Sequence, residues 1–156
     1  LSIDEALLEA HRARCHPLAL RWTGPGRELL VPAPDQVRTV LDEIVGNLLD
    51  NSRAVGARTV MLEVDEKDRD TLVIKLEDDG PGFGQSDPEL PFQRGFTRRP
   101  GGTGLGLARC RSQARSLGGE LAIGEPAAPG ARLVLTLPRV CSGPAGPGRA
   151  AASAPA

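Results

Sequence analysis

The chain of 156 residues has the size of one domain and can bury a hydrophobic core of its own. Its 19 Lys and Arg residues nearly balance its 20 Asp and Glu residues, so the net charge of −1 gives no general attraction to nucleic acid or to an anionic membrane surface. The apolar runs are much shorter than the roughly 18 residues that span a bilayer and no secretory signal is present, so we expect a cytoplasmic domain.

The first predicted elements are short. Residues 4–14 contain good helix formers with apolar residues at helical spacing, which predicts one short helix. Alternating or consecutive apolar residues at 18–22 and 29–31 flank a Gly-Pro-Gly turn and predict two short strands. Pro32 and Pro34 then break the chain.

The strongest helix signal begins at Asp35 and ends near Gly56. Apolar residues recur between these positions at spacings of three and four, which is the period of a helix with one buried face. They are Val37, Val40, Leu41, Ile44, Val45, Leu48 and Leu49. We expect this face to pack against the core.

The remainder predicts a sheet with one more helix. Four segments with strand-like alternation are 59–64, 71–76, 121–124 and 131–137, of which the first two form a predicted antiparallel hairpin. Residues 103–117 predict a helix, whereas 85–102 contain many chain breakers and predict a long mobile loop.

The C-terminal segment differs in composition from the rest of the chain. Residues 141–156 are almost entirely Ala, Pro, Gly and Ser, which cannot bury a core, so we expect a folded domain over 1–140 and a disordered tail beyond it. The cysteines Cys15, Cys110 and Cys141 lack the spacing of metal ligands, and we expect reduced thiols.

A polar stripe runs along the long predicted helix. Glu43, Asn47 and Asn51 are four residues apart, so their side chains lie on one face of it. Aligned carboxylate and amide oxygens can hold a hydrated Mg²⁺ beside phosphates, because this hard ion takes few protein oxygens and keeps several waters. An ordinary solvent-exposed face is the alternative interpretation of the same residues.

Two glycine-rich segments are suited to a nucleotide. Asp78 comes at a strand end, where it can accept hydrogen bonds from an exocyclic amine, and the glycines that follow let the backbone approach a flat ligand. Residues 101–107 lead into a helix, whose free N–H groups favour phosphate. Each segment by itself is also compatible with an ordinary turn.

A local basic zone covers the mobile loop and the helix after it. No acidic residue occurs from Gln93 to Gly119, whereas this stretch holds Arg94, Arg98, Arg99, Arg109, Arg111 and Arg115. Such a zone suits an anion such as a triphosphate. A solvated helix face is the alternative, particularly for Arg111 and Arg115.

Together and in this order, the segments resemble the N, G1, F and G2 boxes of histidine kinases. The boxes are Glu43/Asn47/Asn51, Asp78-x-Gly80-x-Gly82, Phe92 with Phe96, and Gly102-x-Gly104-x-Gly106. Histidine kinases belong to an ATPase superfamily (GHKL) that includes DNA gyrase, the heat-shock chaperones and mismatch-repair MutL. The resemblance covers about residues 2–138, and four motifs in order are far more specific than any one of them.

The resemblance implies an α+β architecture, the Bergerat ATP-binding fold. This is a two-layer α/β sandwich in which helices cover one face of a mixed, mostly antiparallel sheet. ATP would bind between the polar helix and the mobile loop, which would act as a lid.

By similarity, the site residues acquire roles. Asp78 would bind the adenine amine, Asn47 would ligate Mg²⁺, and Asn51 would lie near the phosphates, with Glu43 and Asn47 as the catalytic candidates. Gly80 and Gly82 would make room for the base. The lid residues would anchor the lid or contact the triphosphate; they are Phe92, Phe96, Arg98, Gly102, Thr103, Gly104, Leu105 and Gly106.

The implied function is that of the ATP-binding catalytic domain of a two-component sensor histidine kinase. It would transfer the γ-phosphate of ATP to a histidine on a dimerisation domain outside this sequence, and its further partner would be a response regulator. Neither His11 nor His16 lies in the family's phosphoacceptor setting. No contact with nucleic acid or membrane is implied for this fragment, although the full-length protein would be a membrane-anchored sensor.

Other functions remain open at this stage. An ATP-hydrolysing relative would use Glu43 to activate water, and a serine kinase that phosphorylates an anti-sigma antagonist is a close variant. A non-catalytic docking module is disfavoured because Asp78, Asn47 and the glycines are all present. The chain departs from the kinase pattern at Ser52, where alanine is common. It also lacks the Lys that many kinases have just after Asn51, and Arg53 or Arg58 would replace the phosphate contact of that Lys.

Overall fold

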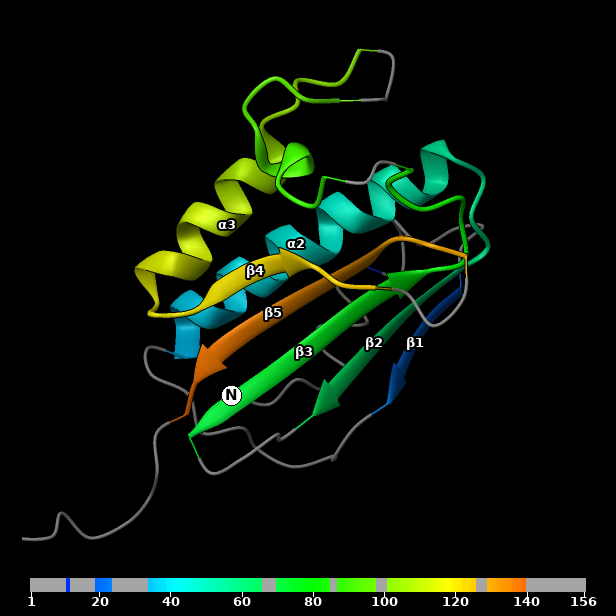
Figure 1. Cartoon of the computed structure of the whole chain (residues 1–156). Coiled ribbons are helices and arrows are strands. Elements are labelled where there is room, and N and C mark those ends of the chain that lie inside the picture. The colour runs from blue at the N-terminus through cyan, green and yellow to red at the C-terminus, as the bar shows by residue number, and fades with distance from the viewer. Residues whose placement is uncertain are drawn as a thin grey trace, which may run out of the picture.

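The computed structural model describes residues 11, 19–23, 34–65, 70–84, 87–97, 101–125 and 129–139. Within these ranges, helices lie over one face of a twisted sheet (Figure 1). The elements are β1 (Ala19–Thr23), α2 (Pro34–Ala54), β2 (Thr59–Asp65), β3 (Thr71–Asp78), the 3-10 helix η1 (Leu90–Phe92), α3 (Gly106–Ser116), β4 (Glu120–Ile123) and β5 (Arg132–Pro138).

The sheet has five strands in the order β1-β2-β3-β5-β4. β1 pairs with β2 in parallel, whereas the three other pairs are antiparallel. The expected mixed, mostly antiparallel sheet is therefore confirmed. This order inserts the last strand between β3 and β4, so residues 130–133 come beside the end of β3 although they are more than fifty positions away in the sequence.

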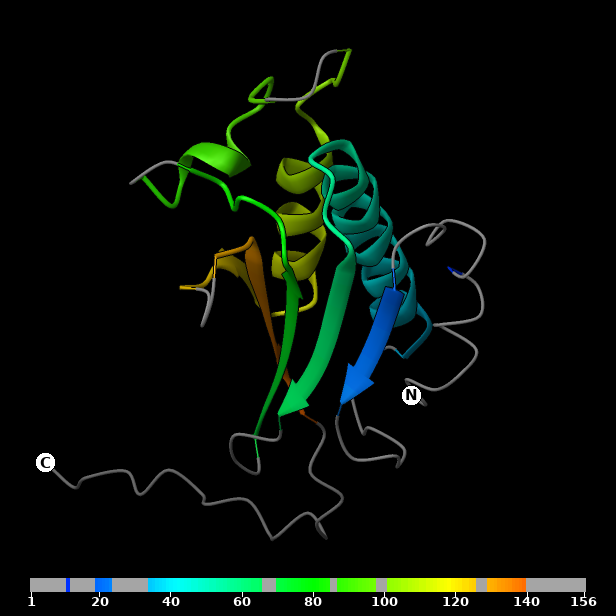
Figure 2. The ribbon, with the colours of Figure 1, turned by 90° about the vertical axis from the view of Figure 1, so that its right-hand side faces the viewer.

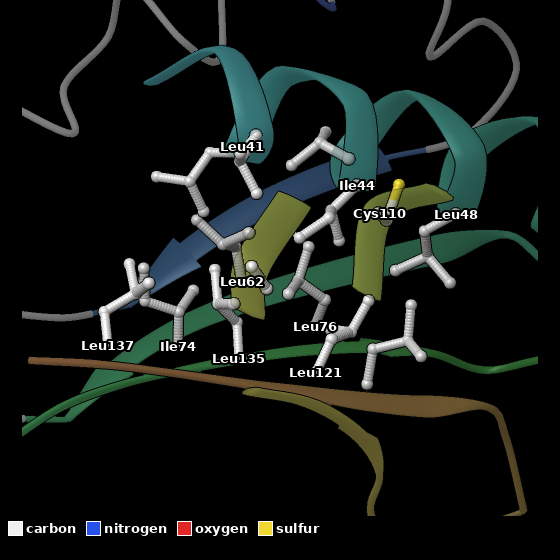
Figure 3. Packing of buried hydrophobic residues seen from close by; sticks show 14 of the residues in the cluster. Leu41, Ile44, Leu48, Leu62, Ile74, Leu76, Cys110, Leu121, Leu135 and Leu137 are labelled. Atoms are coloured by element: carbon white, nitrogen blue, oxygen red, sulfur yellow. The ribbon is translucent and has the colours of Figure 1, made fainter. Parts of the chain in front are cut away.

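The core lies between the sheet and the two longer helices. Along β5, the buried Leu133, Leu135 and Leu137 alternate with partly exposed residues, because successive strand side chains point to opposite faces. Figure 3 shows leucine and isoleucine side chains of α2 directed toward those of the strands. Figure 2 shows that α2 and α3 lie side by side on the same face of the sheet, which makes the two-layer α/β sandwich.

The end of α2 is defined by a glycine. Gly56 has φ of +79°, a conformation that side chains rarely adopt, and its N–H donates to the carbonyl of Arg53. The N–H of Ala57 donates to the carbonyl of Ser52 at 2.9 Å. These contacts close the last turn of α2 and direct the chain into β2.

The helices at 35–56 and 103–117 and the strands at 59–64, 71–76, 121–124 and 131–137 are confirmed within a few residues. The larger difference is that α3 begins at Gly106, because Gly104 has φ of +65° and is packed directly against the backbone of Gly95. A Cβ on Gly104 would lie 2.3 Å from the carbonyl carbon of Gly95.

Several predictions concern residues outside the described ranges. They are the strand at 29–31 and the tail at 141–156, together with the helix at 4–14 apart from His11, which is helical. Where the structure can be inspected, none of its helices combines the length and apolar character that crossing a membrane requires.

Candidate nucleotide-binding site

A cavity of about 260 Å³ opens between the C-terminal half of α2, the end of β3 and the segment that leads into α3. This volume is near the lower end of small-molecule sites, which have about 300–1,000 Å³. Its wall brings together many of the predicted site residues: Asn47, Asn51, Asp78, Gly82, Phe96, Gly102, Thr103, Gly104 and Gly106. The N, G1 and G2 boxes therefore contribute all of these residues except Phe96, which comes from the F box.

Asp78 lines the cavity and is only 4% exposed. Its Oδ1 accepts hydrogen bonds from the N–H groups of Gly80 at 2.9 Å and Ala131 at 3.0 Å. Its Oδ2 accepts one from the hydroxyl of Ser52 at 2.6 Å. Because all three partners donate, the carboxylate acts as an acceptor, and Oδ2 has a remaining lone pair for an N–H group of a ligand.

Ser52 is therefore more than a departure from the kinase pattern. It is completely buried, four residues after Leu48 on the core face of α2, and its hydroxyl finds its partner in Asp78. The signal in the sequence was a hydroxyl at an apolar helix position, since buried polar groups require a hydrogen-bond partner. The identity of the partner depended on the packing of α2 over β3.

Two glycines are required where the loop after β3 meets β5. A Cβ on Gly82, which has φ of +76°, would lie 2.7 Å from the carbonyl oxygen of Gly130. A Cβ on Gly130 would lie 2.0 Å from the carbonyl oxygen of Asp78. Gly80, by contrast, does not contribute to the cavity wall; it is buried and supports Asp78 through its N–H group.

The amide of Asn47 has a defined orientation. Its Nδ2 donates to the backbone carbonyl of Glu43 at 2.9 Å and to the thiol sulfur of Cys110 at 3.3 Å. Burial raises the pKa of the Cys110 thiol to about 11, so the sulfur stays in the neutral thiol form. With both amide protons engaged, Oδ1 is the atom that can face a cation.

This arrangement meets the requirements of Mg²⁺. The ion prefers oxygen and usually takes one or two protein ligands beside phosphates and water. Oδ1 of Asn47 faces the start of α3, where a Cβ on Gly106 would come within 2.2 Å of it. The last glycine of the G2 box therefore lets α3 approach the proposed metal ligand. The described ranges contain no group of three or more His, Cys, Asp and Glu residues that could hold a metal ion.

Glu43 does not line the cavity. Its Oε1 accepts a hydrogen bond from Nη2 of Arg109 at 2.6 Å, which forms an ion pair between α2 and α3. Of the polar stripe, Asn47 and Asn51 face the cavity, whereas the Glu43 side chain is directed to α3.

The predicted lid residues lie in different places, and Gly102, Thr103, Gly104 and Gly106 line the cavity as described above. Phe96 and Thr97 contribute to the wall, whereas Phe92 is 9% exposed and belongs to the core. Leu105 is 49% exposed and is not part of the wall. Arg98 lies outside the described residues.

Three arginines of the basic zone have acidic partners within the fold. Arg109 pairs with Glu43, and Arg111 and Arg115 pair with carboxylates from β4 and from the segment before η1. The stretch has no acid of its own, but the fold brings acids from other elements against it. Neither Arg53 nor Arg58, the proposed replacements for the missing Lys, contributes to the wall.

The cavity also contains residues that the motifs did not indicate: Leu48, Asp50, Ala54, Val55, Phe83, Pro91, Thr97, Leu107, Ala131 and Leu133. Ala54 lies three residues after Asn51, one helical turn further along the face of the polar stripe, so the helical period could have located it. Ala131 and Leu133 carry no such signal, because only the sheet order brings β5 beside Asp78.

Comparisons with known proteins agree with this geometry. Residues 33–140 match the family described as histidine kinase-, DNA gyrase B- and HSP90-like ATPase. The sensor histidine kinase WalK of Bacillus subtilis (strain 168) is 34% identical over 121 residues, which cover 73% of this chain and 20% of WalK. The sensor protein PhoQ of Escherichia coli (strain K12) is 37% identical over 105 residues, which cover 65% of this chain and 21% of PhoQ.

The chain thus spans about a fifth of the length of these curated relatives. Among solved structures, the mycobacterial sensor histidine kinase MprB superposes with a TM-score of 0.68 at 27% identity, covering 86% of this chain and 91% of that chain. Sequence motifs, fold and relatives agree, and the chain belongs to the histidine kinase-, DNA gyrase B- and HSP90-like ATPase family as a domain of the histidine kinase type.

Proposed function

We propose that this domain binds ATP with Mg²⁺ and transfers the γ-phosphate to a histidine on the dimerisation domain of a two-component sensor kinase. The observation that carries the proposal is one cavity wall that holds an acceptor carboxylate, an oriented amide oxygen and a glycine-rich helix start. These three groups match the amine, the metal-bound phosphates and the phosphate oxygens of one nucleotide.

In the proposed complex, Oδ2 of Asp78 accepts a hydrogen bond from the exocyclic amine of adenine. Gly82 leaves space for the base, and Asn51, one turn after Asn47, faces the phosphates. Asn47 would hold Mg²⁺ through Oδ1, and the ion when bound would supply positive charge to the phosphates. The backbone N–H groups of residues 102–106 would surround the triphosphate, since bare glycines let an anion come close.

The transfer itself requires little covalent chemistry from this domain. The acceptor nitrogen of histidine forms a bond to the γ-phosphorus while the bond to the oxygen that bridges the β and γ phosphates breaks, and ADP leaves. The contribution of the chain is to fix the nucleotide and its developing charge in place. The acceptor histidine and the response regulator lie in other domains or proteins, and we propose a membrane-anchored sensor as the full-length context.

The alternative is a member of the same superfamily that hydrolyses ATP or phosphorylates serine. Hydrolysis would require a base beside the attacking water, and Glu43 was the candidate. Two observations weigh against that role: Glu43 forms an ion pair with Arg109, and Glu43 does not line the cavity. We therefore favour transfer to an external histidine.

A labelling experiment distinguishes the alternatives. The fragment is incubated with radiolabelled ATP and Mg²⁺, alone and with the dimerisation domain of the full-length protein. We expect poor self-labelling, and an acid-labile phosphohistidine on the added domain. Efficient self-labelling of His11 or His16, an acid-stable phosphoserine product, or rapid ATP hydrolysis without transfer would each contradict the proposal. If folded protein bound no adenine nucleotide at millimolar concentration, the nucleotide site itself would be refuted.

A further inference from the structure

Arg111 lies outside the cavity wall, yet its guanidinium group joins three elements. Its Nη1 and Nη2 donate to the two carboxylate oxygens of Glu89 at 2.5 and 3.2 Å. Its Nε donates to Glu120 of β4 at 2.7 Å. Only 13% of the Arg111 side chain is exposed, although its partner Glu89 is 63% exposed.

The same guanidinium group has a further contact. Its central carbon lies 4.5 Å from the centre of the Phe92 ring, which is within the range of a cation–π interaction. Arg111 therefore donates hydrogen bonds to Glu89 and Glu120 and also makes a cation–π contact with Phe92. A lysine keeps the charge but cannot reproduce this combination, because its ammonium group is neither planar nor forked.

The contacts change the ionisation of the carboxylates. The hydrogen bonds from Arg111 lower the pKa of Glu89, and those to Glu89 in turn raise the pKa of Arg111. Burial by itself raises the pKa of Glu120, but the hydrogen bonds from Arg111 and Arg115 outweigh it and the net shift is downward. Glu89, Glu120 and Arg111 are therefore charged near neutral pH.

Two of the partners of Arg111, Glu89 and Phe92, belong to residues 89–93 of the lid, which we call the lid root. η1 has three residues, and its backbone bonds include those from Phe92 N–H to Glu89 and from Gln93 N–H to Leu90. A 3-10 helix this short has little stability of its own. Within η1, Phe92 packs in the core while the neighbouring Pro91 forms part of the cavity wall. The position of this wall therefore depends on what holds η1 to α3.

We propose that Arg111 is a positioning residue of the nucleotide site. Its contacts with Glu89, Phe92 and Glu120, which we call the clamp, hold η1 against α3 and thereby fix the position of the lid root and of Pro91 in the cavity wall. This inference rests on the proposed nucleotide-binding function. Loss of the clamp lets the lid root occupy other positions. The apparent affinity for a nucleotide then falls in proportion to the fraction of molecules whose root is in place.

The experiment compares Arg111→Met with Arg115→Met. Arg115 is one turn further along α3, is 55% exposed and also pairs with Glu120, but the cation–π contact with Phe92 belongs to Arg111. We expect Arg111→Met to weaken binding of a non-hydrolysable ATP analogue about 3- to 10-fold, while adenosine affinity changes less than about twofold. Arg115→Met is expected to remain within about twofold of the unmodified chain for both ligands.

Hydrogen exchange of the nucleotide-free proteins gives a readout independent of ligand binding. Faster exchange over residues 89–97 is expected in Arg111→Met and not in Arg115→Met, with Arg111→Lys between them. Glu89→Gln removes a partner that is 63% exposed in its side chain and should shift exchange in the same direction with the fold intact. It provides the test if Arg111→Met does not fold.

The outcomes separate the two proposals. If the unmodified chain binds no nucleotide, the proposed function fails, while the exchange data still decide whether the clamp exists. If nucleotide binds normally but the Arg111 and Glu89 variants match Arg115→Met in affinity and exchange, the positioning role is refuted. Equal loss of ATP-analogue and adenosine affinity in Arg111→Met would also overturn it, because it would indicate a general structural effect.

Discussion

Replacing Asp78 with asparagine tests the adenine assignment with little damage to the fold. Alanine would leave the donors of Ser52, Gly80 and Ala131 without their acceptor, at about 1–3 kcal/mol for each buried group. That sum is comparable with the whole stability of a domain, which is about 5–15 kcal/mol. Asparagine retains Oδ1 for the two N–H groups, and its Nδ2 can donate to a rotated Ser52 hydroxyl.

The substitution affects nucleotide binding at the position of Oδ2 of Asp78. In Asp78→Asn an amide N–H₂ group replaces the acceptor that we assign to the adenine amine, so two donors would face each other. A hydrogen bond to a charged group contributes about 1.5–3 kcal/mol. Its loss predicts a fall in ADP affinity of about 10- to 100-fold, since each 1.4 kcal/mol is a factor of about ten. The free energy of unfolding should change far less.

Calorimetric titration with ADP and Mg²⁺ measures this effect, and thermal unfolding of the same samples monitors the fold. Asp79→Asn is a matched control, because Asp79 is adjacent but points away to the N–H groups of Arg58 and Thr59 and does not line the cavity. It should bind ADP within about threefold of the unmodified chain. Undiminished ADP affinity in a folded Asp78→Asn variant would place the adenine site elsewhere.

Three further predictions concern the metal, the lid and pH. Asn47→Ala should reduce the Mg²⁺-dependent gain in ATP affinity about tenfold and phosphotransfer by more, while adenosine affinity survives; equal losses would point to misfolding. A triphosphate analogue should slow hydrogen exchange in the lid, residues 85–102, and a lid that exchanges equally in both states would contradict its proposed closure. The pKa values of Glu89, Glu120 and Asp79 in the folded chain lie below their ordinary values of 4.5, 4.5 and 3.8. The stability that these carboxylates contribute is therefore fully present above the ordinary pKa values, and it is lost as the pH falls through the lowered pKa values of the folded chain. The midpoint of thermal unfolding should therefore decrease from pH 7 to pH 3, and an increase would refute this ionisation scheme.

The sequence by itself determined the helices, the strands and the class of site, because each of these depends on residues that are close together in the chain. The spacing of apolar residues in α2 and their alternation in β2, β3 and β5 depend only on helix and strand geometry, and both are confirmed. The four boxes were equally visible, because each is a short run whose glycines or polar residues do not fit a plain core. Their order along the chain indicated the family to which the chain belongs.

The tertiary structure alone decided which side chains complete the site. Ser52 and Ala131 both bind Asp78, although neither belongs to a box, because α2 packs over the end of β3 and β5 is inserted beside it. The orientation of Asn47 depends on a cysteine of α3, 63 positions further along the chain. Such contacts follow from the order of strands and the packing of two helices, which a local pattern does not encode.

The arginines show most clearly the difference between what the sequence predicts and what only the folded structure decides. Their number and the absence of acids around them were properties of the sequence, and they predicted an anion site. Glu43, Glu89 and Glu120 come from three other parts of the chain and neutralise three of these charges once the helices and the sheet have packed. Electrostatic interaction depends on distance in space and on burial, so only the folded chain determines which charges remain available to a ligand.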